Sequence, residues 1–137
     1  MIKKTQDLQA VRKIRHQVFV VEQNVSEEEE WDGLDGEAIH FLAHLDGNPV
    51  GTARILLRGD TGKIGRVAVL PAARGTGLGA GLIRAALEEL ATIDGIRQAK
   101  LGAQTHAIGF YEKLGFTAYG PVYDDAGIPH RDMTRAV

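Results

Sequence analysis

The stretch Val67-Ala-Val-Leu-Pro-Ala-Ala-Arg-Gly-Thr-Gly-Leu-Gly-Ala-Gly81 decides the fold of this chain. A short β-branched run ends at Pro71, and a glycine-rich turn then opens the apolar-striped segment 82–94. Glycine adopts backbone angles that other residues resist, and no side chain shields its N–H group. The free N–H groups of a helix's first turn bind anions, because the positive end of the helix dipole lies behind them. The stretch therefore predicts a phosphate site, to which Arg74 adds a charged, forked donor.

Two common nucleotide sites fit this spacing poorly. A Walker loop requires a lysine followed by serine or threonine after its last glycine, but two apolar residues follow Gly81. The dinucleotide fingerprint G-x-G-x-x-G/A is matched within residues 75–80, but residues 71–74 separate it from the preceding strand. The acidic residue that such a site needs, Asp94, also falls in a turn rather than at the end of a strand. The first site is excluded and the second is disfavoured.

The glycine stretch resembles the acetyl-CoA-binding segment of the GNAT N-acetyltransferase superfamily. That segment follows the pattern Arg/Gln-x-x-Gly-x-Gly/Ala, which Arg74, Gly77 and Gly79 or Ala80 fill here. A second stretch, Phe110-Tyr-Glu-Lys-Leu-Gly-Phe116, is similar to the Tyr-bearing helix and Gly-Phe strand of the same superfamily. Two motifs at the expected separation are far more specific than either motif alone.

Further stretches of the sequence are similar to those of the small bacterial ElaA/YjcF-like branch of that superfamily. They are Arg15-His-Gln-Val-Phe-Val-Val-Glu-Gln23, the residues Asp32, Asp35 and His40, and Gly127-Ile-Pro-His130 followed by Met133. Sequence, rather than a known acceptor, defines this branch, so the resemblance leaves the acceptor open.

The periodicity along the chain predicts the elements of one domain, residues 1–137. Apolar residues recur every three or four positions from Leu8 to Val21, which predicts an amphipathic helix interrupted near residues 19–21. The period becomes two from Ile39, and short turns join three strands into an antiparallel meander. The expected elements are strands 2–4, 39–45, 50–57, 63–70, 98–104 and 116–123, an edge strand at 131–135, and helices from 7, 78 and 106.

This order implies, through the resemblance, the GNAT-type acyl-CoA N-acyltransferase fold. It is an α/β (α+β) fold, in which a mixed, mostly antiparallel sheet of six to seven strands is flanked by about four helices.

Composition excludes several functions. The formal charge of −2 and the lack of a basic block argue against nucleic-acid binding. No cysteine is present, which excludes disulfides, a thiolate nucleophile and a cysteine-based metal site. No apolar run approaches the length of a membrane span and the first residues lack a signal peptide's apolar core, so we expect a cytoplasmic protein without membrane partners.

The resemblance implies where acetyl-CoA would bind. Its pyrophosphate would lie on the N–H groups from Arg74 to Ala80, and its pantetheine arm would run along strand 63–70, where a backbone N–H group would face the thioester carbonyl. Gln104 occupies the place where many relatives carry an asparagine that contacts the pantetheine. The implied cofactor-binding residues are Val67, Ala68, Val69, Arg74, Gly75, Thr76, Gly77, Leu78, Gly79, Ala80, Gln104 and Tyr111.

Tyr111 is the candidate general acid. A phenol ordinarily titrates near pH 10, close to an alkyl thiol, so it can protonate the departing CoA thiolate. The alternative is a buried aromatic side chain that only packs between Phe110 and Leu114, and both roles can hold together.

The general base is less well defined, because the strand 63–70 carries no acidic residue where relatives often have a glutamate. Glu22, His40 and His130 are the candidates for the base or for the acceptor site. Glu22 would otherwise be a solvated charge at a helix end, and the two histidines would be surface or hydrogen-bonded side chains.

Two further patterns have simple interpretations. His40 and His44 lie about 13 Å apart on a strand, so their spacing does not form a zinc site, and we expect no metal. The run Glu27–Glu30 is expected to be solvated, although it could instead attract a cationic amine to the mouth of the cleft.

The sequence thus predicts acetyl transfer from acetyl-CoA to a primary amine by direct attack in a ternary complex. The alternative is a CoA-binding sensor or structural domain that kept the fold and lost turnover. The acceptor is open among a metabolite, a polyamine, an antibiotic and a protein N-terminus. A C-terminal edge strand could also pair with a second copy to form a homodimer.

Overall fold

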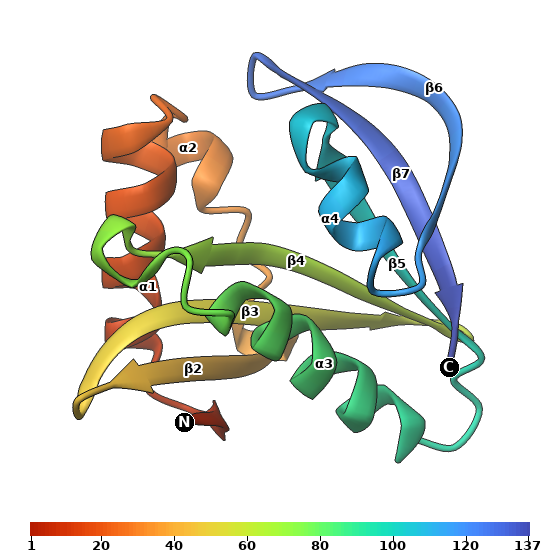
Figure 1. Ribbon diagram of the computed structural model, residues 1–137, viewed down its shortest axis with the longest axis horizontal. Coiled ribbons are helices and arrows are strands. Elements are labelled where there is room, and N and C mark those ends of the chain that lie inside the picture. Colours follow the sequence, from red (N-terminus) through yellow and green to blue (C-terminus); the bar gives the residue numbers. More distant parts are fainter.

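The computed structural model describes residues 1–137 and is built around one seven-stranded sheet (Figure 1). The strands lie in the order β1-β2-β3-β4-β5-β7-β6, and all neighbours are antiparallel except β4 and β5. The strands are β1 (Ile2–Thr5), β2 (Ile39–Leu45), β3 (Asn48–Arg58), β4 (Thr61–Val69), β5 (Gln98–Gln104), β6 (Thr117–Asp125) and β7 (Ile128–Ala136). This confirms the mixed, mostly antiparallel sheet that the sequence predicts.

Four α-helices and several tighter or wider turns connect the strands. They are α1 (Leu8–Arg15), α2 (Glu27–Glu30), α3 (Leu78–Ala91) and α4 (Ile108–Glu112), with the π-helix η1 (His16–Glu22) and the 3-10 turns η2 (Asp35–Glu37), η3 (Pro71–Ala73) and η4 (Thr105–Ala107). Asp7 caps α1, because its side chain accepts a hydrogen bond from the Ala10 N–H group. The expected interruption near residues 19–21 is instead a change of pitch, since α1 continues directly into η1.

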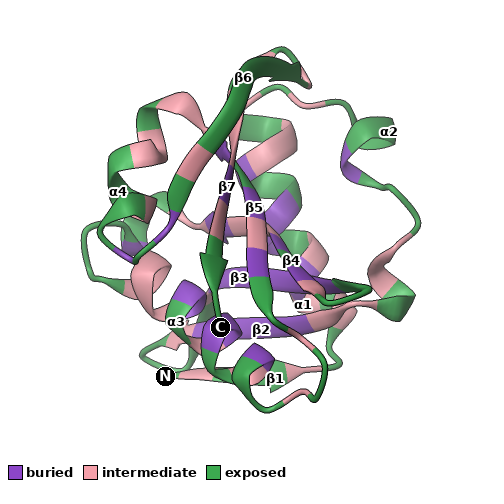
Figure 2. Cartoon of the chain, turned by 90° about the vertical axis from the view of Figure 1, so that its right-hand side faces the viewer, coloured by how far each residue is buried: buried purple, intermediate pink, exposed green.

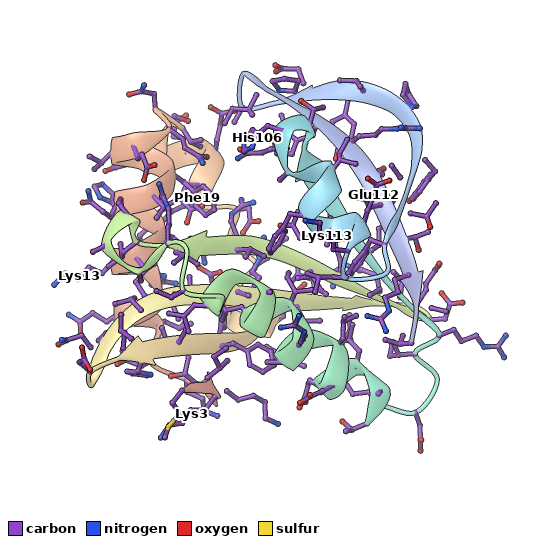
Figure 3. All side chains as sticks on the ribbon, in the orientation of Figure 1. Lys3, Lys13, Phe19, His106, Glu112 and Lys113 are labelled. Atoms are coloured by element: carbon purple, nitrogen blue, oxygen red, sulfur yellow. The ribbon has the colours of Figure 1, made fainter.

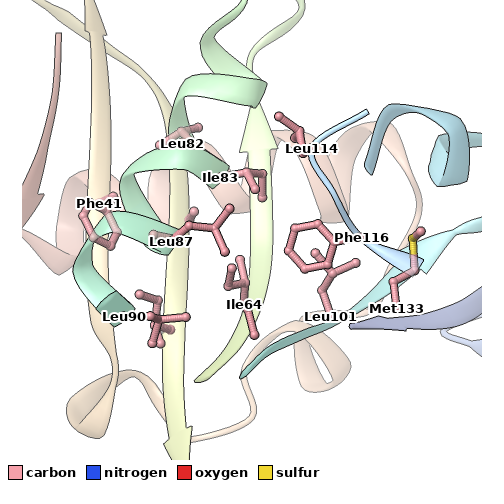
Figure 4. Close-up of a cluster of buried hydrophobic side chains, with 14 of the residues drawn as sticks. Phe41, Ile64, Leu82, Ile83, Leu87, Leu90, Leu101, Leu114, Phe116 and Met133 are labelled. Atoms are coloured by element: carbon pink, nitrogen blue, oxygen red, sulfur yellow. The ribbon is translucent and has the colours of Figure 1, made fainter. Parts of the chain in front are cut away.

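The main core lies between the sheet and the helices α3 and α4, which cover the same face (Figure 1). The apolar stripe of α3 buries Leu82, Ile83, Leu87 and Leu90 against the strands, as Figure 4 shows. Burying a side chain of this size stabilises the fold by about 1.5–3 kcal/mol. The stripe therefore fixes α3 on the sheet, and with it the glycine-rich turn at its N-terminus.

A second, smaller core holds α1 on the opposite face of the sheet. Val11, Ile14 and Val18 pack there with Leu42 of β2 and Ala68 of β4. Because helices cover both faces of β2, its consecutive residues from His40 to Ala43 are all buried. This placement brings η1, the continuation of α1, beside the end of β4.

The sheet splits where β4 meets β5. These strands pair only from Thr61–Gln98 to Lys63–Lys100, and they then diverge, as Figure 1 shows. Gly62 permits close packing at the junction, since a Cβ atom there would lie 2.2 Å from Leu90 Cδ2. Beyond Lys63 the side of β4 that faces β5 has no strand partner. The divergence therefore opens a gap with a free strand edge on each side.

A bulge bends β4 within this gap. The register between β3 and β4 shifts between Thr52 and Arg54, so that one β3 residue faces two residues of β4. Arg66 lies in the bulge with φ of 49°, a left-handed conformation that few residues other than glycine adopt. Such conformations are strained and often occur at functional sites.

The prediction that the C-terminal strand lies at the edge of the sheet is wrong. β7 pairs with both β5 and β6, so the C-terminal strand is internal and β6 is the free edge. Figure 2 shows β6 as mostly exposed. A second copy could therefore not pair with the C-terminal strand without displacing a neighbour. Helix α3 also ends at Ala91, before Gly95, which occupies the following turn with φ of 86°.

Candidate active site

A cavity of about 670 Å³ lies at the split between β4 and β5. Its walls come from η1, β4, Arg74 before the glycine-rich turn, β5, α4 and the β6–β7 hairpin. Figure 3 shows Phe19 on the η1 side and His106 near the start of α4, and both side chains line the cavity. Segments far apart in the sequence therefore meet around one space.

The glycine-rich turn presents free backbone donors. No N–H group from Gly75 to Ala80 donates a hydrogen bond to another part of the protein. Gly75 and Gly77 make this geometry accessible, because their φ values are 78° and 84°. The N–H group of Arg74, which the sequence-based prediction includes, instead donates to Pro71 O. The donor set that an anion could use thus begins at Gly75.

The Arg74 side chain is held by the protein itself. Its Nη1 and Nη2 atoms each lie 2.6 Å from a carboxylate oxygen of Glu22, and its Nε donates to Val69 O at 3.0 Å. The hydrogen bonds from Arg74 lower the pKa of Glu22 below its ordinary value. Glu22 is therefore a weak base in this state, and Arg74 can offer the same two-pronged contact to a phosphate only after it leaves Glu22.

The free edge of β4 forms one long side of the cavity. Val67, Ala68 and Val69 all line it, and β5 does not pair with them. An extended ligand could form main-chain hydrogen bonds with such an edge, as an added strand does. The edge is continuous with the glycine-rich turn through η3, so one ligand could reach both.

Tyr111 faces the cavity from α4. Its ring makes edge-to-face contacts with Phe110 and Phe116, at centroid distances of 5.0 and 6.1 Å. Burial raises the pKa of Tyr111 to about 12, so the hydroxyl group keeps its proton at neutral pH. The packing role and the cavity-facing role therefore coexist.

Gln104 lies across the gap from β4 and joins a short polar chain. Its Nε2 donates to Gln23 Oε1 at 3.1 Å, and its Oε1 lies 2.8 Å from His106 Nε2. Gln23 directly follows Glu22, so two consecutive residues at the end of η1 hold Arg74 and Gln104.

The three candidates for the base occupy different places. Glu22 and His130 line the cavity, but His40 does not. His40 is 3% exposed and its Nε2 lies 2.9 Å from Asp35 O, behind the loop that follows α2. The structure therefore places His40 away from the cavity that the other two candidates line, on the face of β2 that α1 covers.

An ion-pair network that the sequence analysis missed forms one wall of the cavity. Glu30 is only 3% exposed, so the expectation of a fully solvated acidic run is wrong at this residue. Its carboxylate lies 2.5 Å from Arg15 Nε and 2.9 Å from Arg66 Nε. A charged residue within an apolar strand, such as Arg54 between Ala53 and Ile55, was the available signal.

The same network includes two aspartates of the loop after α2. Asp32 pairs with Arg54 and Arg66, and Asp35 pairs with Arg15 at 2.7 Å and with Arg54 at 3.1 Å. Burial raises the pKa of each aspartate, but the hydrogen bonds and charges of the arginines outweigh it and lower both pKa values overall. These carboxylates are neutralised and are poor bases.

Two further features concern possible metal sites and the length of the helices. No group of three or more His, Cys, Asp or Glu side chains is placed to hold a metal ion. None of the helices has both the length and the apolar character needed to cross a bilayer.

The split sheet, the free donors of the glycine-rich turn and the cavity-facing tyrosine define the class of acyl-CoA N-acyltransferases. The model of the acetyltransferase (GNAT) domain matches residues 3–137, and the chain belongs to this family of N-acetyltransferases.

Relatives and solved structures agree with this assignment. The uncharacterized N-acetyltransferase YjcF of Bacillus subtilis is 41% identical over 123 residues, covering 89% of this chain and 87% of YjcF. The crystal structure of ElaA from Escherichia coli has a TM-score of 0.85 at 34% identity and covers 98% of this chain and 99% of ElaA. The resemblance to the ElaA/YjcF-like branch is thus confirmed.

A more distant neighbour has the same fold. An aminoglycoside 6′-N-acetyltransferase solved in complex with coenzyme A gives a TM-score of 0.78 at 15% identity, covering 99% of this chain and 96% of that chain.

Proposed function

We propose that this chain binds acetyl-CoA and transfers the acetyl group to a primary amine by direct attack in a ternary complex. The carrying observation is that the free N–H groups from Gly75 to Ala80 are joined through η3 to the unpartnered edge of β4, which lines the cavity. The first suits a pyrophosphate and the second suits the amide-containing pantetheine arm. Membership of the GNAT family and the coenzyme A bound to the same fold in the aminoglycoside acetyltransferase support this occupant.

Each part of acetyl-CoA would contact a different group of residues at the site. The pyrophosphate would accept hydrogen bonds from the glycine-rich turn, with Arg74 as the charged donor once it leaves Glu22. The pantetheine amides would pair with Val67, Ala68 and Val69, and Gln104 would donate from the opposite strand. The thioester would then lie within the gap, between the β4 bulge and Tyr111.

Direct attack is the simplest mechanism for these residues. The chain has no cysteine to form an acetyl-enzyme, so the amine nitrogen would attack the thioester carbonyl carbon itself. A main-chain N–H group of β4 would stabilise the negative oxygen that forms, because donors fixed before the reaction need no reorganisation. Tyr111, protonated at neutral pH, would supply the proton for the departing thiolate.

A thiol-release assay tests the proposal. Isothermal titration first measures acetyl-CoA binding, and release of the coenzyme A thiol is then followed with spermidine, kanamycin, glucosamine and a peptide with a free N-terminus. Binding together with amine-dependent release supports the proposal. Binding without release from any amine favours a CoA-binding sensor instead, and no binding to either acetyl-CoA or coenzyme A contradicts both functions.

A further inference from the structure

The wall formed by β5, β7 and β6 carries a histidine that the chemistry above does not use. His130 of β7 lies directly opposite Gln104 on β5 and opposite Tyr123 on β6. Residues directly opposite each other on neighbouring strands point to the same face of the sheet. All three residues line the cavity, so His130 is placed at the gap beside Gln104, which is expected to contact the pantetheine.

A hydrogen bond to the main chain determines the tautomer of His130. Its Nδ1 atom lies 2.7 Å from Ile128 O. A carbonyl oxygen only accepts hydrogen bonds, so Nδ1 carries a proton in either charge state of the ring. In the neutral ring the lone pair must therefore be on Nε2, the ring nitrogen farther from the main chain. Nε2 has no hydrogen-bond partner in the protein, so it is free to accept a proton.

A neighbouring tyrosine holds the ring in place. The Tyr123 ring stacks on His130 with a centroid distance of 6.0 Å and an interplanar angle of 24°. The Tyr123 hydroxyl group donates to Asp132 Oδ1 at 2.8 Å and fits over Gly102, where a Cβ atom would lie 2.4 Å from it. Burial and the hydrogen bond to Asp132 raise the pKa of Tyr123, so this hydroxyl group stays protonated and anchored. The anchored Tyr123 ring thus fixes the orientation of the His130 imidazole ring.

Three cavity-lining carboxylates and one cavity-lining histidine are already engaged by other groups. Glu22 is bound by Arg74, and the carboxylates of Glu30 and Asp32 are each paired with two arginines. The other cavity-lining histidine, His106, is exposed, and its Nε2 already lies 2.8 Å from Gln104 Oε1. His130 therefore combines a free lone pair, a fixed ring and a position on the cavity wall.

We propose that His130 is the general base that removes a proton from the acceptor amine, an inference that rests on the proposed function. Nε2 takes one proton from the ammonium form, and the freed nitrogen lone pair forms the C–N bond at the thioester carbonyl carbon. As the C–S bond breaks, the sulfur receives the Tyr111 proton and the phenolate regains one from the attacking nitrogen. The first proton, held by His130, then leaves to solvent, so the ammonium form and acetyl-CoA yield an amide, the coenzyme A thiol and one proton.

Several titratable groups surround His130. Tyr123 and Asp125 face the region from β6, Asp132 of β7 accepts the Tyr123 hydrogen bond, and His106 approaches from η4. Only the neutral imidazole ring can accept the proton, so kcat/KM should rise with pH as the fraction of neutral ring increases and should then level off.

Substitution of His130 tests the proposal with the panel amine that gives the fastest thiol release. We expect His130→Gln to lower kcat/KM by about 10²-fold and to abolish the rise with pH, while the Kd for acetyl-CoA and the melting temperature stay unchanged. The matched control is His16→Gln, at an exposed histidine that does not line the cavity, which should leave both kcat/KM and its pH profile near those of the unsubstituted protein. Added imidazole should partly restore turnover of His130→Ala, which a purely structural role would not allow.

An NMR measurement gives an additional test that needs no acceptor. Nitrogen-15 spectra of the unsubstituted protein should show a protonated Nδ1 and an unprotonated Nε2 in the neutral His130 ring. The opposite tautomer, or an unchanged kcat/KM and pH profile in His130→Gln, overturns the proposal while leaving acetyl transfer intact. An unsubstituted protein that binds acetyl-CoA and releases no thiol overturns it together with the proposed function.

Discussion

At the scale of single residues, Tyr111 shows how one side chain serves both packing and chemistry. Its ring contacts Phe110 and Phe116, and the residue also lines the cavity. Burial raises its pKa to about 12, which favours the neutral phenol. The Tyr111 phenol is therefore protonated and available as an acid at neutral pH, although it is a weaker acid than a tyrosine in water.

The substitution Tyr111→Phe separates the two roles. We expect kcat to fall by about 10²-fold, because the general acid is lost while the ring packing is retained. The Kd for acetyl-CoA and the melting temperature should barely change, since the hydroxyl group acts mainly in the transition state. Below about pH 10 the pH profile should keep its shape, because a raised pKa moves loss of the proton to higher pH. Normal turnover combined with a lower melting temperature would mean that Tyr111 only packs.

Glu22 provides a second test at this scale. It holds Arg74 through two hydrogen bonds of 2.6 Å, which an incoming pyrophosphate must replace. Glu22→Gln weakens that competition and removes a negative charge beside the phosphates, so acetyl-CoA should bind about three- to tenfold more tightly. The control is Glu89→Gln, which disrupts a surface pair with Lys4. Weaker binding in Glu22→Gln would mean that Glu22 instead positions Arg74 for the phosphates.

At the scale of elements, the glycine-rich turn shows what local sequence determines. Its donors are main-chain groups, and their freedom depends on residues adjacent in the chain. The spacing of Arg74, Gly77 and Gly79 was therefore enough to predict the turn and the helix after it. The ion-pair network was not predictable in this way, because Arg15, Glu30 and Arg54 meet only after α1, α2 and β3 have packed together. The order of β6 and β7 likewise depends on long-range pairing.

Substitution of Gly77 tests the turn as a phosphate site. Gly77→Asp should weaken acetyl-CoA binding at least tenfold, because a carboxylate would repel the pyrophosphate. No atom lies within 4 Å of a Cβ placed there, and aspartate tolerates the left-handed conformation better than most residues, so the protein should stay folded. Gly77→Asn, which has the same shape without the charge, is the matched control and should lose less affinity. Equal affinity in all three proteins would place the phosphates elsewhere.

At the scale of the whole molecule, the ion-pair network joins α2, which belongs to neither apolar core, to α1 and the sheet. Arg15 comes from α1, Glu30 from α2 and Arg66 from the β4 bulge, and Glu30 pairs with both arginines. The loop between α2 and β2 is thereby held against the sheet. The network consequently supports the cavity wall, because Glu30 and Arg66 both line the cavity.

Removing one charge from this network should destabilise the entire fold. Glu30→Gln leaves Arg15, which is 1% exposed, without one of its two carboxylate partners, and this should cost about 3–5 kcal/mol of unfolding free energy. Glu27→Gln is the matched control on the same helix, because Glu27 is exposed and its loss should cost less than about 1 kcal/mol. Denaturant unfolding of both variants measures the difference. Equal stabilities would contradict the importance of the buried pairs.

The end of η1 has a consequence for the sequence of events during turnover. Glu22 and Gln23 hold the two side chains, Arg74 and Gln104, that acetyl-CoA would contact. We expect acetyl-CoA to take over these contacts and release the segment, to which Val18 and Phe19, which line the same cavity, belong. Short π-helical turns are often found at functional sites. The wall of the amine pocket would then take its final form only after acetyl-CoA has bound, so we expect ordered addition of the two substrates, with the amine second.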